Sequence, residues 1–202
     1  MITINTLKWS EFVGVAIIAL LIIITQSFQP GSIELLRYES ISVNQGEWWR
    51  LISANFTHAN WNHVWLNLLG LILIDYIFQP FVNQKVRLTA LSFCIFTNLM
   101  LLHLFMTLDW YVGLSGALHG FLITCLLIAA KPLKPYAHLF IVLIAGKLFI
   151  EMNWEVNDVT AGMIETNVVE EAHLAGSISG LIFYLLYFSW LKLLKNKTSH
   201  QI

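Results

Sequence analysis

Charge is what this sequence most lacks. Only 11% of its 202 residues are Asp, Glu, Lys or Arg, against about 25% in soluble domains. The net charge of −1 gives no reason to expect a nucleic acid as a partner. Cysteine and proline are also scarce, with two and four residues. Their scarcity excludes a disulfide-stapled secreted module and a proline-rich disordered chain.

Apolar residues replace the missing charge. They make up 57% of the chain, and the mean hydropathy is +0.70. Six apolar segments each approach the roughly 20 residues that cross a hydrocarbon core. We therefore predict an all-α, polytopic membrane protein with one six-helix domain over residues 1–202. The predicted helices cover about 9–28, 61–81, 87–108, 115–130, 136–152 and 172–191.

The distribution of basic residues predicts the orientation in the bilayer. Eight of the eleven lie on one side of a six-helix topology, which the positive-inside rule makes cytoplasmic. They are Lys8, Lys85, Arg87, Lys131, Lys134, Lys192, Lys195 and Lys197. Most acidic residues fall on the other side, so both termini are expected in the cytoplasm.

Polar residues inside apolar segments are the candidates for function. The second, fourth and sixth segments each carry one near the end that enters from outside: His63, Ser115 and His173. A serine hydroxyl is a weak nucleophile unless a base takes its proton, and a Ser115–His173 hydrogen bond would supply one. Asn67 shares a helix face with His63, and both side chains could stabilise an oxyanion together with the Ser115 amide.

Glycine spacing predicts which helices approach closely. The fourth segment has Gly116 and Gly120, and the sixth has Gly176 and Gly180. Pairs of small residues four apart let helix backbones pack tightly in lipid. We therefore expect the fourth and sixth helices to pack together. The two cysteines, Cys94 and Cys125, lie in apolar runs and are interpreted as small hydrophobes.

Other polar residues receive structural interpretations. Lys147 and Glu151, four apart in the fifth segment, are expected to form an ion pair. Glu170 and Glu171 are expected in the first turn of the sixth helix, where negative charge is favourable. Asp75 is expected at the inner surface, in contact with water.

Two other functions and a second base are possible on the sequence. His119, one turn after Ser115, could act as the base, although we expect it to support a Ser115–His173 pair. Four histidines could instead form a metal site: His58, His63, His119 and His173. No carboxylate or cysteine is expected at their depth, so we predict no metal and no cofactor. A protein that only binds transmembrane helices is the third alternative.

Four motifs in order carry a family resemblance. They are Trp49-Arg50 in the first outside loop, His63-x-x-x-Asn67, Gly113-x-Ser115-Gly116 and Ala172-His173-x-x-Gly176-x-x-x-Gly180. With them the chain resembles rhomboid intramembrane serine proteases over essentially its whole length. The resemblance implies that Ser115 is the nucleophile and His173 the general base, in a dyad without an acid. It also assigns His63, Asn67 and the Ser115 amide to the oxyanion hole.

One position departs from the family pattern. Many rhomboids place a tyrosine four residues after the serine, where this chain has His119. The run Gly113–Gly120 resembles the rhombosortase branch, which implies membrane-anchored bacterial surface proteins as substrates. Such substrates carry a C-terminal glycine-rich motif, a transmembrane helix and a basic tail. The resemblance also implies a bacterial inner membrane, with the site opening outward. Trp49 and Arg50 are otherwise interpreted as an interfacial anchor.

Overall fold

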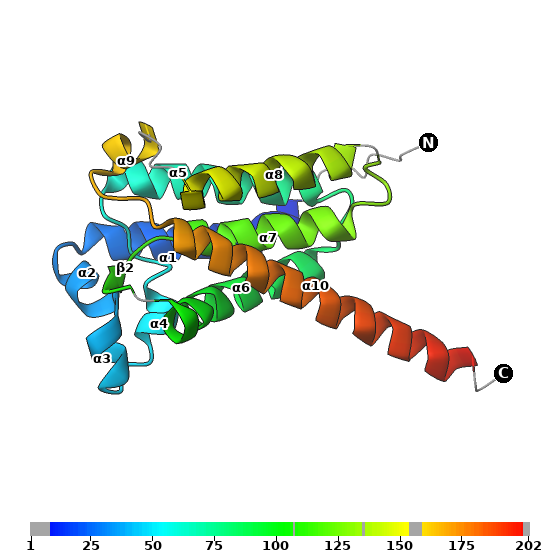
Figure 1. The fold of residues 1–202 in the computed structure, drawn as a ribbon, viewed down its shortest axis with the longest axis horizontal. Coiled ribbons are helices and arrows are strands. Elements are labelled where there is room, and N and C mark those ends of the chain that lie inside the picture. Colours follow the sequence, from blue (N-terminus) through cyan, green and yellow to red (C-terminus); the bar gives the residue numbers. More distant parts are fainter. Residues whose placement is uncertain (1–8, 107, 135, 154–158, 200–202) are drawn as a thin grey trace.

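The computed structural model describes residues 9–106, 108–134, 136–153 and 159–199. Lys8, one of the basic residues used to predict orientation, lies outside these ranges. The described chain is almost entirely helical, with one pair of two-residue strands. Figure 1 shows the main helices gathered in a bundle, with the start of α10 packed beside α7.

Six apolar helices form the bundle, and each overlaps one of the predicted ranges. They are α1 (Val13–Ser27), α5 (Trp61–Phe78), α6 (Gln84–Phe105), α7 (Ser115–Ile128), α8 (Tyr136–Asn153) and α10 (Glu170–Ser199). A 3₁₀ turn, η1 (Trp9–Phe12), precedes α1. Among the described residues, α5, α6, α8 and α10 are long and apolar enough to span a bilayer, while α1 and α7 are shorter. The architecture is therefore that of a multi-pass membrane protein.

The last helix is longer than predicted. α10 continues past residue 191 to Ser199, because the basic tail contains mostly good helix formers and neither Gly nor Pro. Its red end projects away from the bundle in Figure 1. It also begins two residues before the predicted 172, and its first turn contains Glu170 and Glu171 as expected.

Short elements gather at the opposite end of the bundle. They are α2 (Gly31–Leu36), β1 (Tyr38–Glu39), α3 (Ser40–Asn44), α4 (Arg50–Ser53), β2 (Trp110–Tyr111) and α9 (Val159–Ile164). In Figure 1 they lie at the left, away from the red end of α10. The sequence predicted none of these elements.

An antiparallel ladder joins the first long connection to the start of α7. Tyr38 of β1 pairs with Tyr111 of β2. Two residues after β2, the Gly113 amide donates to the Ala54 carbonyl oxygen at 2.9 Å. Because buried backbone groups need partners, these bonds fix the segment that leads into α7.

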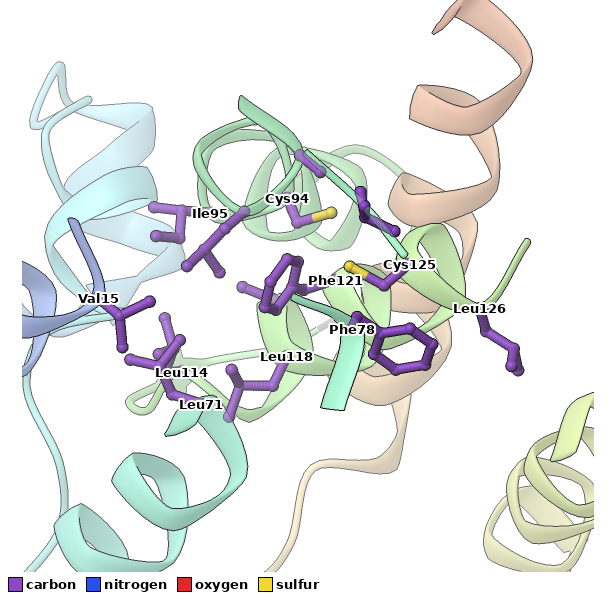
Figure 2. Packing of buried hydrophobic residues seen from close by; sticks show 14 of the residues in the cluster. Val15, Leu71, Phe78, Cys94, Ile95, Leu114, Leu118, Phe121, Cys125 and Leu126 are labelled. Atoms are coloured by element: carbon purple, nitrogen blue, oxygen red, sulfur yellow. The ribbon is translucent and has the colours of Figure 1, made fainter. Parts of the chain in front are cut away.

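The apolar core surrounds α7. Figure 2 shows Leu118 and Phe121 of α7 among side chains from α1, α5 and α6. The same cluster contains Cys94 and Cys125, which are both free and fully buried. The interpretation of the cysteines as small hydrophobes is therefore confirmed.

Glycines bring α7 and α10 into backbone contact. A Cβ atom on Gly176 would collide with the carbonyl oxygen of Gly116, and one on Gly180 would collide with that of Gly120. A Cβ atom on Gly120 would in turn collide with the carbonyl oxygen of Gly176. The two glycines of α7 thus face the two glycines of α10, and a side chain on any of the four would push the helices apart.

A buried ion pair corrects the expectation for Asp75. Asp75 is 1% exposed, and its Oδ1 accepts from Nε of the fully buried Arg87 at 2.7 Å. Asp75 therefore does not meet water, and Arg87 is a core residue rather than an interfacial charge. Each charge offsets the desolvation cost of the other.

The Trp49-Arg50 motif also differs from its interpretation. Arg50 is buried, pairs with Glu47 at 2.5 Å, and donates to the carbonyl oxygens of Glu34 and Arg37 at 3.0 and 2.8 Å. It braces the first loop instead of facing lipid headgroups, whereas Trp49 is 47% exposed.

Candidate active site

One large cavity gathers the predicted residues. It has a volume of about 1380 Å³ and lies among α5, α7, α8 and α10. Its lining includes His63, Asn67, Ser115, His119 and His173. The structure thus brings together residues from three helices that are far apart in the sequence.

Ser115 is the first residue of α7, and its hydroxyl faces a tyrosine. Its Oγ lies 3.2 Å from the Tyr111 hydroxyl, which also accepts from the Gly116 amide at 3.3 Å. Among the described contacts there is no Ser115–His173 hydrogen bond. The sequence reasoning missed Tyr111, whose only signal was an aromatic residue four positions before the serine.

His173 lies in the first turn of α10, beside the start of α7. A Cβ atom on Gly116 would lie 2.7 Å from the Ala172 carbonyl oxygen, so the two helix starts touch. The His173 side chain is 8% exposed, and its Nδ1 lies 3.3 Å from Oε2 of Glu151. The glycine contacts therefore hold His173 next to Ser115 within the cavity.

His119 is stacked on His173, with ring centroids 4.1 Å apart. Its Nδ1 lies 2.9 Å from the Ser115 carbonyl oxygen, and its Nε2 lies 3.4 Å from Lys147 Nζ. A carbonyl only accepts and an ammonium only donates, so Nδ1 carries the proton and Nε2 accepts. Both nitrogens of His119 are thus engaged, which leaves neither for the Ser115 proton.

The predicted ion pair of α8 is confirmed and extends into the site. Lys147 Nζ lies 2.5 Å from Glu151 Oε1, while Glu151 Oε2 faces His173. The expectation that no carboxylate lies at the depth of the histidines is therefore wrong. The spacing of residues along α8 could not show this, because it does not fix which face of the helix turns toward α10.

Gly113 and His63 fit against each other. Gly113 has φ +113°, in the region that favours glycine. A Cβ atom there would lie 2.7 Å from Cε1 and Nε2 of His63. The Asn60 side chain accepts from the His63 amide at 2.9 Å and caps α5. Gly113 thus leaves room for the His63 ring, and the Asn60 cap fixes the backbone that carries it.

Asn67 is engaged with its own helix. Its Nδ2 donates to the His63 carbonyl oxygen at 2.9 Å. Its Oδ1 is buried without a hydrogen-bond partner among the described residues. The amide donor therefore does not face Ser115.

Two other serines in the membrane helices bond to their own helix. Ser177 and Ser179 of α10 donate to carbonyl oxygens one turn back.

The four histidines named for a metal site form two pairs. His119 stacks on His173, and His58 meets His63 edge-on at 4.9 Å. His58 is fully buried and outside the cavity lining. Its burial and the His63 ring hold the pKa of His58 well below its usual value, so it stays neutral. No three His, Cys, Asp or Glu side chains of the described residues converge as metal ligands would.

A model of the rhomboid domain family matches residues 45–190. The chain belongs to the rhomboid family. It is also 30% identical over 152 residues to rhomboid-like protein 11, a chloroplastic protein of Arabidopsis thaliana. That match covers 69% of this chain and 52% of the relative, so this rhomboid spans about half the length of that protein. All four motifs lie within the matched range.

Proposed function

We propose that this rhomboid is an intramembrane serine endopeptidase that cleaves membrane-anchored proteins near the outer end of their transmembrane helix. Ser115 attacks the peptide carbonyl carbon, His173 takes the proton and returns it to the leaving amine, and water releases the acyl group. The observation that carries this proposal is that Ser115 and His173 line one cavity and lie in the first turns of two helices in backbone contact.

The depth of the serine supports cleavage inside the membrane. α7 has 14 residues, which at 1.5 Å per residue is about 21 Å. This is shorter than a hydrocarbon core of about 30 Å. A helix of this length that begins at Ser115 suits a nucleophile recessed below the outer surface. The proposed topology has six membrane helices and places both termini in the cytoplasm.

We assign the oxyanion hole to the Ser115 amide, His63 and Asn67. The Ser115 amide is at the first position of α7, where helix N–H groups lack intrahelical acceptors. His63 lines the same cavity, where Gly113 leaves room for its ring and the Asn60 cap bonds its backbone amide. Asn67 joins them when its amide rotates away from the His63 carbonyl oxygen.

The cavity suits an apolar substrate with a flexible backbone. Its walls include apolar side chains of α5 and α8, among them Leu66, Ile74, Val142 and Ile150. A substrate helix must unwind before its peptide bond reaches Ser115, and glycine eases unwinding. The apolar walls and the need for an unwound substrate, together with His119 in place of tyrosine, support rhombosortase-type substrates. Such substrates carry a glycine-rich motif, a transmembrane helix and a basic tail, and lie in a bacterial inner membrane.

Labelling with a fluorophosphonate probe tests the nucleophile and base. The probe is expected to label the parent and not Ser115→Ala, and to label His173→Ala at least about 100-fold more slowly. Ser179→Ala is the matched control, because Ser179 is a buried serine whose hydroxyl is bound to Ala175. Label retained in Ser115→Ala would overturn the assignment. A parent that binds a reporter helix but takes no label would instead support a non-catalytic binder.

A reporter tests the substrate class. It joins a soluble domain to a glycine-rich motif, a transmembrane helix and a basic tail. The parent in proteoliposomes is expected to release the soluble domain, and Ser115→Ala to release none. Replacing the reporter's glycines with leucine should reduce release at least about 10-fold, because the helix then resists unwinding. Equal release from both reporters would contradict the glycine-rich class while leaving the protease assignment intact.

A further inference from the structure

We propose that Glu151 is a positioning residue for His173, so that the site is a Ser115–His173–Glu151 arrangement rather than a dyad without an acid. This inference rests on the proposed protease function. It concerns how the base is held, and it adds a carboxylate from α8, a helix outside the four motifs that carried the family resemblance.

The geometry fixes the tautomer of His173. Glu151 Oε2 lies 3.3 Å from Nδ1 of His173, and an ionised carboxylate can only accept. The proton of the neutral imidazole is therefore on Nδ1, which leaves Nε2 as the basic nitrogen. The face of the ring rests on His119, so its rotation is restricted as well.

The two oxygens of Glu151 have separate partners. Oε1 lies 2.5 Å from Lys147 Nζ, and Oε2 faces His173. Lys147 and Glu151 are the only Lys, Arg, Asp or Glu residues in α8. Ion pairing with Lys147 offsets the cost of a carboxylate in an apolar helix, and it leaves the second oxygen for the imidazole.

The carboxylate acts during proton transfer without taking the proton. As Ser115 Oγ bonds to the carbonyl carbon, its proton moves to His173 Nε2. The resulting imidazolium keeps its Nδ1–H directed at Glu151, whose negative charge stabilises it. When the carbon–nitrogen bond of the substrate breaks, the Nε2 proton passes to the leaving amine, and Glu151 is ionised throughout.

Two variants separate the charge of Glu151 from its space-filling. Glu151→Gln keeps the size but removes the charge, and its amide can donate to Nδ1 and select the wrong tautomer. We expect kcat for reporter cleavage to fall about 10- to 100-fold, with KM within about twofold. Glu151→Asp keeps the charge and should retain more activity than Glu151→Gln. A role in packing alone predicts the opposite order.

Matched controls exclude a general loss of charge. Glu171→Gln removes an exposed carboxylate in the same turn as His173, and it should cleave like the parent. Lys147→Met removes the ion pair and the Lys147–His119 contact but leaves the Glu151–His173 contact. We expect a smaller loss of kcat than in Glu151→Gln. An equal loss would mean that Lys147, through its contacts with Glu151 and His119, sets the activity, and it would overturn the positioning role of Glu151.

Nitrogen NMR of labelled histidine supplies a readout that does not need activity. The neutral His173 ring is expected to carry its proton on Nδ1 in the parent and to lose this preference in Glu151→Gln. A proton on Nε2 in the parent would overturn the inference, even if every variant folds poorly. If Glu151→Gln has the kcat of the parent while the fluorophosphonate probe still labels Ser115, the positioning role of Glu151 is also overturned. A parent protein that the fluorophosphonate probe does not label would instead overturn the proposed protease function.

Discussion

The imidazole of His119 lies nearly parallel to that of His173, with the ring planes inclined by 21° and the centroids 4.1 Å apart. The proposed base is thus held on its face by one residue of α7 and at its edge by Glu151 of α8. The departure from the family pattern at position 119 replaces one flat ring, that of tyrosine, with another. It changes the ring that supports the base rather than the base itself.

The stacking predicts that His119 can be replaced by another aromatic residue. His119→Tyr should keep reporter cleavage within about 10-fold of the parent, because a phenol ring can also stack on an imidazole. His119→Ala should lose more, since it removes the ring and the hydrogen bond to the Ser115 carbonyl oxygen. Cleavage rates in proteoliposomes measure both. If His119→Tyr is as inactive as His173→Ala, His119 has a role in proton transfer.

Gly113 should be more sensitive than another glycine with similar backbone geometry. Gly113→Ala and Gly46→Ala both place a side chain at positive φ, +113° and +105°, at a cost of about 1–2 kcal/mol each. Only Gly113→Ala also pushes on the His63 ring, because no atom of the described residues lies within 4 Å of a Cβ atom on Gly46. Thermal unfolding should shift similarly in both, while fluorophosphonate labelling falls only in Gly113→Ala. Equal labelling would remove His63 from the oxyanion hole.

The contact between α7 and α10 should not tolerate a methyl group. Gly176→Ala places its Cβ against the Gly116 carbonyl oxygen, and overpacking of this kind costs about 1–3 kcal/mol. We expect a lower unfolding temperature in detergent and loss of labelling, because Ser115 and His173 move apart. Gly146→Ala is the control for stability, since its Cβ atom would have no neighbour within 4 Å in the part of the chain that the structure describes. A parent-like Gly176→Ala would contradict the described helix packing.

The buried ion pair predicts a large effect far from the chemistry. Asp75→Ala removes the closer carboxylate partner of the fully buried Arg87, at 2.7 Å, and leaves only Glu11 at 3.5 Å. Breaking a buried pair of this kind costs about 3–5 kcal/mol. Arg37→Ala, which breaks a partly exposed pair with Glu39, should cost less than about 1 kcal/mol. Unfolding in mixed detergent micelles measures both. Equal losses would mean that water reaches Asp75, as its position in the sequence first indicated.

The parts of the site that could be predicted are those set by spacing along one helix. The Lys147–Glu151 pair and the acidic first turn of α10 follow from local rules, and the structure confirms both. What could not be predicted depends on how helices rotate about their axes and on loops. Glu151 reaches His173 only because α8 turns that face toward α10, and Tyr111 reaches Ser115 through a strand whose partner is 73 residues earlier.

The β1–β2 ladder has a consequence for trimming this protein. The family match begins at residue 45, whereas Tyr38, the partner of Tyr111, precedes it. A fragment cut to residues 45–190 would keep every side chain assigned to chemistry but lose β1. Tyr111, which touches the Ser115 hydroxyl, would then sit on an unpaired strand. We therefore expect that a fragment must begin before the family boundary, at or ahead of residue 38, to keep Tyr111 paired beside Ser115.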